Sequence, residues 1–314
     1  ILSFTPGLDL VFGKGSVTKG NVYYREEIRR YSDNDNQDTE LSNLGFNSRY
    51  DNGVTKADFN ASYAQVAQND NDLRATGTIV RRDLTNLGAK LEFGLSEKTS
   101  LAAGISFNKT DYDVASYTDS SIWSLPVDAY FKASPKLDWS VGYRYRSTDL
   151  SGAAVDSTDH FLNVGARGEF TPKLTGQVRV GYGKRSFDVG KDKSLFGFDS
   201  NLTYAFSEKT SYAFNLSNDF GSSGTGDSTE NFRIGLTANS KMSEQWSFTG
   251  GLSLNKTDYP TRSDDFLEGQ LAVTYTLNAM VNFGASYTYR DNSSDRASAE
   301  FTNSVFTFGA NIRY

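Results

Sequence analysis

The sequence predicts an all-β fold made of antiparallel strands, and three features predict it. Apolar residues alternate with small or polar ones along most of the chain, as in the last stretch, where Phe306, Phe308 and Ala310 fall on one side of an extended segment. Aromatic residues make up 14% of the chain, and rings are enriched in strands. Turn-forming residues interrupt the alternation repeatedly, which is typical of hairpins.

The composition favours a barrel in a membrane. Only 37% of residues are hydrophobic, and no uninterrupted apolar run exceeds three residues, so a transmembrane helix, which needs roughly 18 apolar residues, is excluded. The many aromatic residues argue against disorder. A barrel wall needs apolar residues at only every second position. We therefore predict one domain, residues 1–314, that forms a transmembrane antiparallel β-barrel, and a soluble β-sandwich is the weaker alternative.

Two kinds of connection alternate along the chain. Short turns such as Asn52–Lys56 and Ser96–Thr99 recur about every 35 to 43 residues. Longer polar loops lie between them, for example Asp149–Asp159 and Gly221–Ser228. Short turns at one end and long loops at the other are typical of bacterial outer-membrane barrels. Trp139, Trp246 and several tyrosines near the strand ends predict the aromatic girdles of such a wall, the tyrosines being Tyr112, Tyr145, Tyr259, Tyr287 and Tyr289.

The predicted number of strands is 16 to 18. Eight short turns join sixteen segments, and the closing segment from about Ser298 to Tyr314 makes seventeen. Because single-chain bacterial barrels have even counts, we favour eighteen strands with the first one upstream of Ile1. An internal repeat supports the hairpin pattern, since residues 103–112 and 250–259 are similar.

The residue types exclude most catalytic and metal chemistry. The chain has no Cys and a single His, His160, which we expect in a solvated loop beside Asp159. Without a nucleophile and base set, no enzyme is predicted. The acidic loop residues lack the spacing of a calcium loop, so we predict no metal and no cofactor. The net charge of −6 argues against nucleic acid as a partner.

Once the apolar face is assigned to lipid, the alternate residues are predicted to line the pore. They include Arg144, Arg146, Arg167, Arg179 and Arg185 on consecutive segments, with Arg233 and Arg290 elsewhere. Guanidinium groups on a pore wall bind carboxylate or phosphate, so one hypothesis is that this patch favours anions. The alternative is that the arginines pair with Glu169, Asp138 or Asp199 on neighbouring strands and stabilise the wall.

The chain also resembles a known family. Three features carry the resemblance: Phe4-Thr5-Pro6-Gly7-Leu8 ahead of Arg29-Arg30-Tyr31 and an Asp-rich loop, the segment Gly142-Tyr143-Arg144-Tyr145, and the Ser-x-Lys-Thr turns. In these features the chain is similar to the putative beta-barrel porins found with exopolysaccharide export systems. The resemblance implies a wide outer-membrane barrel that passes a polysaccharide delivered by periplasmic partners. It supplies no catalytic residue.

We therefore expect an outer-membrane pore that passes a polar solute, anionic or an exopolysaccharide, by passive transport. The alternative is a structural barrel that sheathes or anchors a secreted chain or an electron carrier without conducting. The expected partners are outer-membrane lipid, the barrel assembly machinery and periplasmic export proteins. Phe308, Ile312 and the terminal Tyr314 resemble the C-terminal signal that the assembly machinery recognises.

Overall fold

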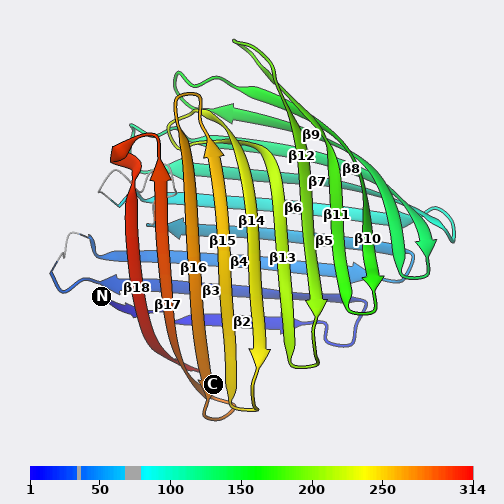
Figure 1. Cartoon of the computed structure of the whole chain (residues 1–314). Coiled ribbons are helices and arrows are strands. Elements are labelled where there is room, and N and C mark those ends of the chain that lie inside the picture. Colours follow the sequence, from blue (N-terminus) through cyan, green and yellow to red (C-terminus); the bar gives the residue numbers. More distant parts are fainter. Residues whose placement is uncertain (34–36, 68–78, 314) are drawn as a thin grey trace.

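The computed structural model describes residues 1–33, 37–67 and 79–313. Eighteen strands in these ranges form one sheet. Figure 1 shows β10 to β18 side by side in a front layer, while β2 to β7 cross behind them. Within the same ranges, no helix is long and apolar enough to cross a membrane. The predicted all-β antiparallel fold of eighteen strands is confirmed.

The strands follow one another along the chain, and each pairs with the next from β2 onwards. A short 3-10 helix, η3 (Ala297–Ala299), precedes the last strand. The strand bounds are β1 (Leu2–Phe4), β2 (Gly7–Phe12), β3 (Thr18–Arg30), β4 (Thr39–Asp51), β5 (Thr55–Val66), β6 (Arg82–Gly94), β7 (Thr99–Tyr112), β8 (Ser120–Ser134), β9 (Leu137–Leu150), β10 (Ser157–Thr171), β11 (Leu174–Phe187), β12 (Lys193–Ala205), β13 (Thr210–Ser222), β14 (Ser228–Lys241), β15 (Trp246–Asp258), β16 (Ser263–Thr276), β17 (Val281–Ser294) and β18 (Phe301–Ile312).

The first strand is interrupted, and this interruption gives the eighteenth segment. β1 and β2 both pair with β3, through Phe4 opposite Ile28 and Gly7 opposite Arg25. Pro6 lies between them and has no backbone N–H to donate to a ladder. The count of eighteen therefore includes two consecutive pieces on one edge of β3. Among the described residues, β18 has no residue-by-residue pairing with either piece.

The short turns lie where the sequence predicts them, and one local interaction fixes most of them. The side-chain oxygen of the first turn residue accepts hydrogen bonds from the backbone N–H groups two and three residues later. Asn52 Oδ1, for example, is 3.1 Å from Val54 N and 2.7 Å from Thr55 N. The same arrangement occurs at Ser96, Ser134, Thr171, Ser207, Ser243 and Asn278.

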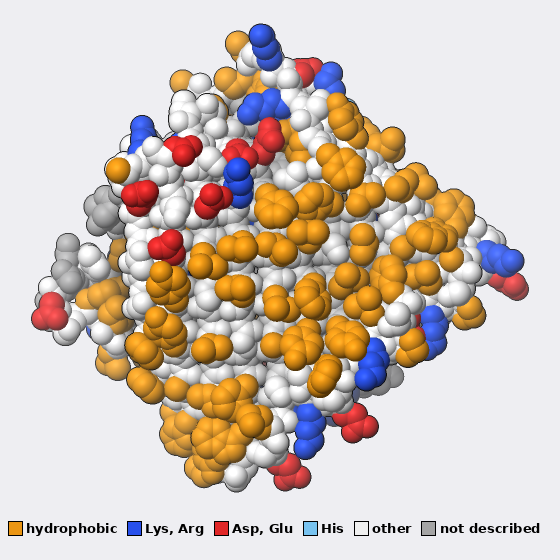
Figure 2. Space-filling model, in the orientation of Figure 1, with side chains coloured by type: hydrophobic (Ala, Val, Ile, Leu, Met, Phe, Trp, Pro, Cys, Tyr) orange, Lys and Arg blue, Asp and Glu red, His pale blue; other side chains and the backbone are white. Residues whose placement is uncertain are grey.

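The strand register sorts side chains onto two faces. Phe46 lies opposite Val22 and Ala61 on the outer face, whereas its neighbour Asn47 lies opposite asparagines on the inner face. Figure 2 shows the outer face of β9 to β18, where apolar side chains cover the middle and charged ones lie at the margins. This band is the surface that lipid covers in a membrane barrel. Phe308 and Ile312 are exposed on this face, while Tyr314 lies outside the described residues.

The prediction of a long loop from Asp149 to Asp159 was wrong. β9 continues to Leu150, and β10 already begins at Ser157. His160 is therefore a strand residue, and its Nδ1 is 2.6 Å from the hydroxyl oxygen of Tyr143 on β9. The first four residues of β10, Ser157 to His160, are all polar, so the alternation of apolar and polar residues that marks the other strands is missing there.

The predicted tyrosine girdle was wrong at two positions. Tyr112 lies opposite Arg82 on the inner face, and the guanidinium carbon of Arg82 is 6.0 Å from the Tyr112 ring centre. Tyr259 follows the end of β15 and lies in a loop. Trp139 and Trp246, by contrast, are exposed beside short turns, as expected for rings at a membrane interface.

Candidate functional site: the inner face of the wall

All seven predicted pore-lining arginines lie on the inner face, but the structure does not bring them together as one basic patch. Among the described residues, six of them have a carboxylate within ion-pairing distance, and Arg233 has none there. They are distributed over β9 (Arg144, Arg146), β10 (Arg167), β11 (Arg179, Arg185), β14 (Arg233) and β17 (Arg290).

Arg167 binds two carboxylates from different strands. Its terminal nitrogens lie 2.7 and 2.6 Å from the two oxygens of Glu92 on β6, which is the two-pronged geometry that a planar guanidinium favours. Its Nε donates to Asp138 on β9 at 3.1 Å. The guanidinium also lies 3.3 Å from the ring centre of the buried Tyr130, a cation–π contact. Arg167 therefore connects β6, β8, β9 and β10.

Arg179 extends the same cluster. One of its terminal nitrogens donates to Asp128 and to the Tyr130 hydroxyl, each at 3.1 Å. Asp128 is 5% exposed, so its charge depends on this partner. We call the group of Glu92, Asp128, Tyr130, Asp138, Arg167 and Arg179 the first ion cluster.

A second ion cluster lies nearer the long loops. Arg185 and Asp159 are 1% and 2% exposed, and two Arg185 nitrogens lie 2.6 and 2.8 Å from the Asp159 oxygens. Arg146 donates to the same carboxylate at 2.6 Å. A charge buried this deeply is stable only when it is paired and hydrogen-bonded. Asp159 therefore holds two guanidinium groups in the lumen.

Asp219 on β13 completes the second cluster. Its carboxylate accepts from Arg144 at 2.8 Å and from Arg146 at 3.0 Å, although β9 and β13 are four strands apart. The chain beyond Asp219 is held as well, since Arg146 donates to the Phe220 carbonyl and Arg185 to the Gly221 carbonyl. The end of β13 thus lies against the inner face of β9 and β11.

The two clusters lie on the inner face of β6 to β11, with Asp219 reaching them from β13, and we call this face the packed region. Five arginines here face five carboxylates, those of Glu92, Asp128, Asp138, Asp159 and Asp219. The alternative that the arginines stabilise the wall is thus the one that this geometry supports. The partners differ from those expected, since Glu169 pairs with Lys136 at 2.6 Å and Asp199 lies 4.0 Å from Arg179. The effect on ion selectivity stays a prediction.

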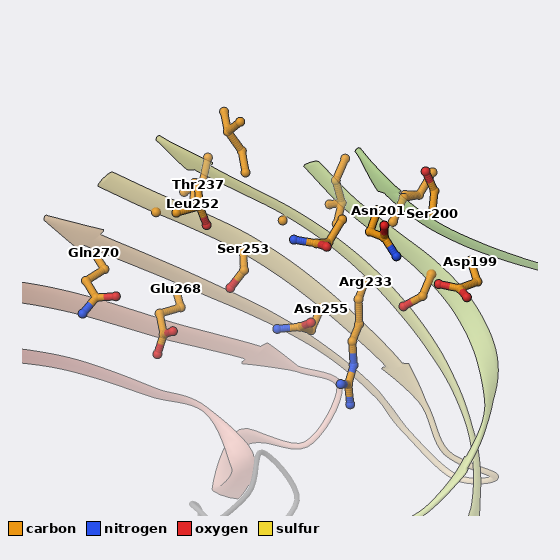
Figure 3. A pocket seen from close by; sticks show the side chains of 17 residues that line it. Asp199, Ser200, Asn201, Arg233, Thr237, Leu252, Ser253, Asn255, Glu268 and Gln270 are labelled. Atoms are coloured by element: carbon orange, nitrogen blue, oxygen red, sulfur yellow. The ribbon is translucent and has the colours of Figure 1, made fainter. Parts of the chain in front are cut away.

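The inner face of β12 to β16 is different, and we call it the open region. It contains a groove of about 480 Å³ lined by polar side chains, among them Asn201, Asn215, Ser253, Asn255 and Gln270. A second groove of about 580 Å³ shares Arg233, Ser253, Asn255 and Glu268 with it, and its remaining lining includes Arg82 of β6, Thr110 of β7 and Ser120 of β8. Figure 3 shows Arg233, Asn255 and Glu268 projecting from neighbouring strands to the same side of the wall.

Sequence reasoning missed two important residues of the packed region. Asp159 was assigned to a loop, and Tyr130 was not considered because a buried inner-face ring is unusual in a water-filled barrel. Leu162 and Val164 alternate with Asn163 and Gly165, and this strand pattern, extended back towards the N-terminus, could have placed Asp159 on the inner face. Over the part of the chain that the structure describes, no group of three or more acidic, His or Cys side chains could hold a metal ion.

The meander of antiparallel strands, the apolar outer band and the polar inner face define the class: a transmembrane β-barrel of the bacterial outer membrane. Comparison with protein families agrees, because residues 19–314 match the family described as "Putative beta-barrel porin 2". The chain belongs to this family. Membership places the chain among the β-barrel proteins of the outer membrane.

Solved structures show the same fold. Two variants of the FrpB iron transporter from Neisseria meningitidis, F3-3 and F5-1, match with TM-scores of 0.55 and 0.52 at 10% identity over 99% of this chain. The siderophore receptor PiuA from Acinetobacter baumannii matches with a TM-score of 0.45 at 13% identity over 95% of this chain. The chain covers 65%, 66% and 64% of those proteins. Comparison with curated proteins gave no significant match.

Proposed function

We propose that the protein is a passive pore for a polar solute and that the solute moves along the open region. The observation that carries this proposal is the polar groove on the inner face of β12 to β16, which a second groove extends towards β6 to β8. Pore selectivity depends on the diameter and on the hydrogen-bonding groups of the lining. In the packed region, ion pairs and buried side chains take up much of the inner face, and the groove beside the first ion cluster is smaller, at about 360 Å³.

The chemistry of the lining supports a solute rich in hydroxyl groups, such as an exopolysaccharide. Asn215, Asn255 and Gln270 each offer an amide that both donates and accepts hydrogen bonds, and the resemblance to porins of exopolysaccharide export points the same way. Periplasmic proteins that deliver the polymer are the partners that this proposal requires. A barrel that only sheathes another protein would need no such continuous polar path.

Conductance through a planar bilayer tests the proposal. Because the chain has no Cys, a single engineered thiol can be modified specifically. We expect discrete channel steps from the unmodified protein, and a fall in conductance when a charged thiol reagent modifies Ser253→Cys in the groove. Ser140→Cys is the matched control, since Ser140 is on the inner face of the packed region and is 3% exposed.

Either of two results would contradict the proposal. A correctly folded barrel that never conducts would favour the structural sheath. Equal effects of the reagent at both cysteines would place the path elsewhere.

A further inference from the structure

Arg233 differs from the other inner-face arginines that the sequence predicts. Arg290 pairs with Glu268 at 2.6 Å, and each arginine of the two ion clusters has at least one carboxylate within ion-pairing distance. In the described ranges, no carboxylate lies within ion-pairing distance of Arg233. Its side chain is exposed and lines both grooves of the open region.

The direct neighbours of Arg233 are neutral hydrogen-bonding residues. The register places Ser217 of β13 opposite it on one side and Asn255 of β15 on the other. Side chains at directly opposed positions are about 5 Å apart at their Cβ atoms, so all three can reach one ligand group. Asp199 is the next charged residue in this row, two strands away on β12, which corresponds to about 10 Å.

We propose that Arg233, Ser217 and Asn255 form a binding point for an oxyanion group, a carboxylate or a phosphate, on the transported solute. A guanidinium binds two oxygens of such a group with its planar fork. The Asn255 amide and the Ser217 hydroxyl supply two further donors. Glu268 does not oppose the ligand, because Arg290 already neutralises it. This inference rests on the proposed pore and names the class of solute.

Two measurements test it. The first is block of single-channel current by trigalacturonate, which carries carboxylates, by glucose 6-phosphate, and by neutral maltotriose. The second is equilibrium binding of the same three probes to the detergent-solubilised barrel, measured by calorimetry, which needs no conductance. Trigalacturonate or glucose 6-phosphate should bind, and the probe that binds more tightly identifies the group. Maltotriose should bind at least about tenfold more weakly, since one charge-assisted interaction is worth about that factor.

Variants of Arg233 show whether the anion binds at a specific site or responds only to the overall charge of the pore lining. Arg233→Gln should weaken binding of the anionic probe about tenfold or more, and Arg233→Lys should restore part of it because the charge remains without the fork. The control is the double variant Glu268→Gln and Arg290→Gln, which removes a neutral pair and leaves the net charge of the path unchanged. It should retain binding.

The failures can be distinguished. Equal binding of maltotriose, or unchanged anion binding in Arg233→Gln, overturns the oxyanion site whether or not the barrel conducts. A barrel that binds the anion through Arg233 but shows no channel steps overturns the proposed pore and leaves the binding site intact.

Discussion

The packed and open regions are built from the same repeated hairpin, yet their glycines differ. Gly142 lies on the inner face of β9, and a methyl group there would be 2.2 Å from an Asp128 oxygen. Gly251 lies on the inner face of β15, and the nearest atom to a methyl group there would be 3.9 Å away. A side chain of the neighbouring strand therefore lies over the glycine in the packed region, whereas the space above the glycine in the open region is free.

The two regions differ in the side chains that cover the inner face of the barrel. Glycine leaves room for side chains of the neighbouring strands, as Gly142 does for Asp128, and long charged side chains link strands that are not adjacent, as Arg167 and Glu92 link β10 and β6. In the open region the same pattern carries amides and hydroxyls that line a groove. The packed region should therefore respond strongly to mutation, and the open region should tolerate it.

The largest effect is expected at the buried charges of the packed region. Asp159→Asn leaves Arg146 and Arg185 without their shared carboxylate, and removal of one partner from a buried ion pair costs about 3 to 5 kcal/mol. Urea unfolding in detergent, followed by tryptophan fluorescence, should show this loss. The control is Asp192→Asn, which breaks the exposed pair with Lys184 and should leave the unfolding midpoint unchanged; similar losses in both variants would contradict the comparison.

A matched pair of glycine substitutions should give the next largest effect. Gly142→Ala forces a shift of Asp128, which is buried and bound to Arg179, and overpacking of this kind costs about 1 to 3 kcal/mol. Gly251→Ala meets only ordinary contacts, so its free energy of unfolding should change by less than about 0.5 kcal/mol. The same denaturation assay measures both, and equal losses would mean that the two regions are packed alike.

The smallest effect on stability is expected in the groove. Asn215→Trp adds a large ring at an exposed inner-face position, so the free energy of unfolding should change by less than about 0.5 kcal/mol. Single-channel conductance should nevertheless fall, because the ring occupies the proposed path. Asn215→Ala controls for loss of the amide and should conduct normally. Unchanged conductance in the Trp variant would place the path away from β13.

The sequence predicted most of the fold because the fold depends on local patterns. Alternation of apolar residues identifies the strands, and Ser, Thr or Asn at the start of each turn explains the short connections. Errors arose where an inner face is polar and buried. Asp159 resembled a loop residue in sequence, since nothing local indicates that Arg146 and Arg185 will surround it.

The site was less predictable because its contacts span distant strands. The seven arginines lie on the inner face, but the partners of some lie up to 75 residues away, as for Arg144 with Asp219 and Arg167 with Glu92. The number of strands between two such residues does not show whether the wall bends enough to bring them together. The distinction between paired arginines and Arg233 therefore required the structure.

The interrupted first strand has a consequence for how the wall can close. Every neighbour pair from β2 to β18 is antiparallel, so the chain direction reverses 16 times between these two strands. β2 and β18 therefore run in the same direction. In lipid, an unpaired strand edge costs several kcal/mol for each exposed backbone group. The two edges cannot satisfy each other with antiparallel hydrogen bonds. The ring can be completed by parallel pairing of β2 with β18, whose hydrogen bonds are evenly spaced and slanted. It can also be completed by an odd number of strands between them.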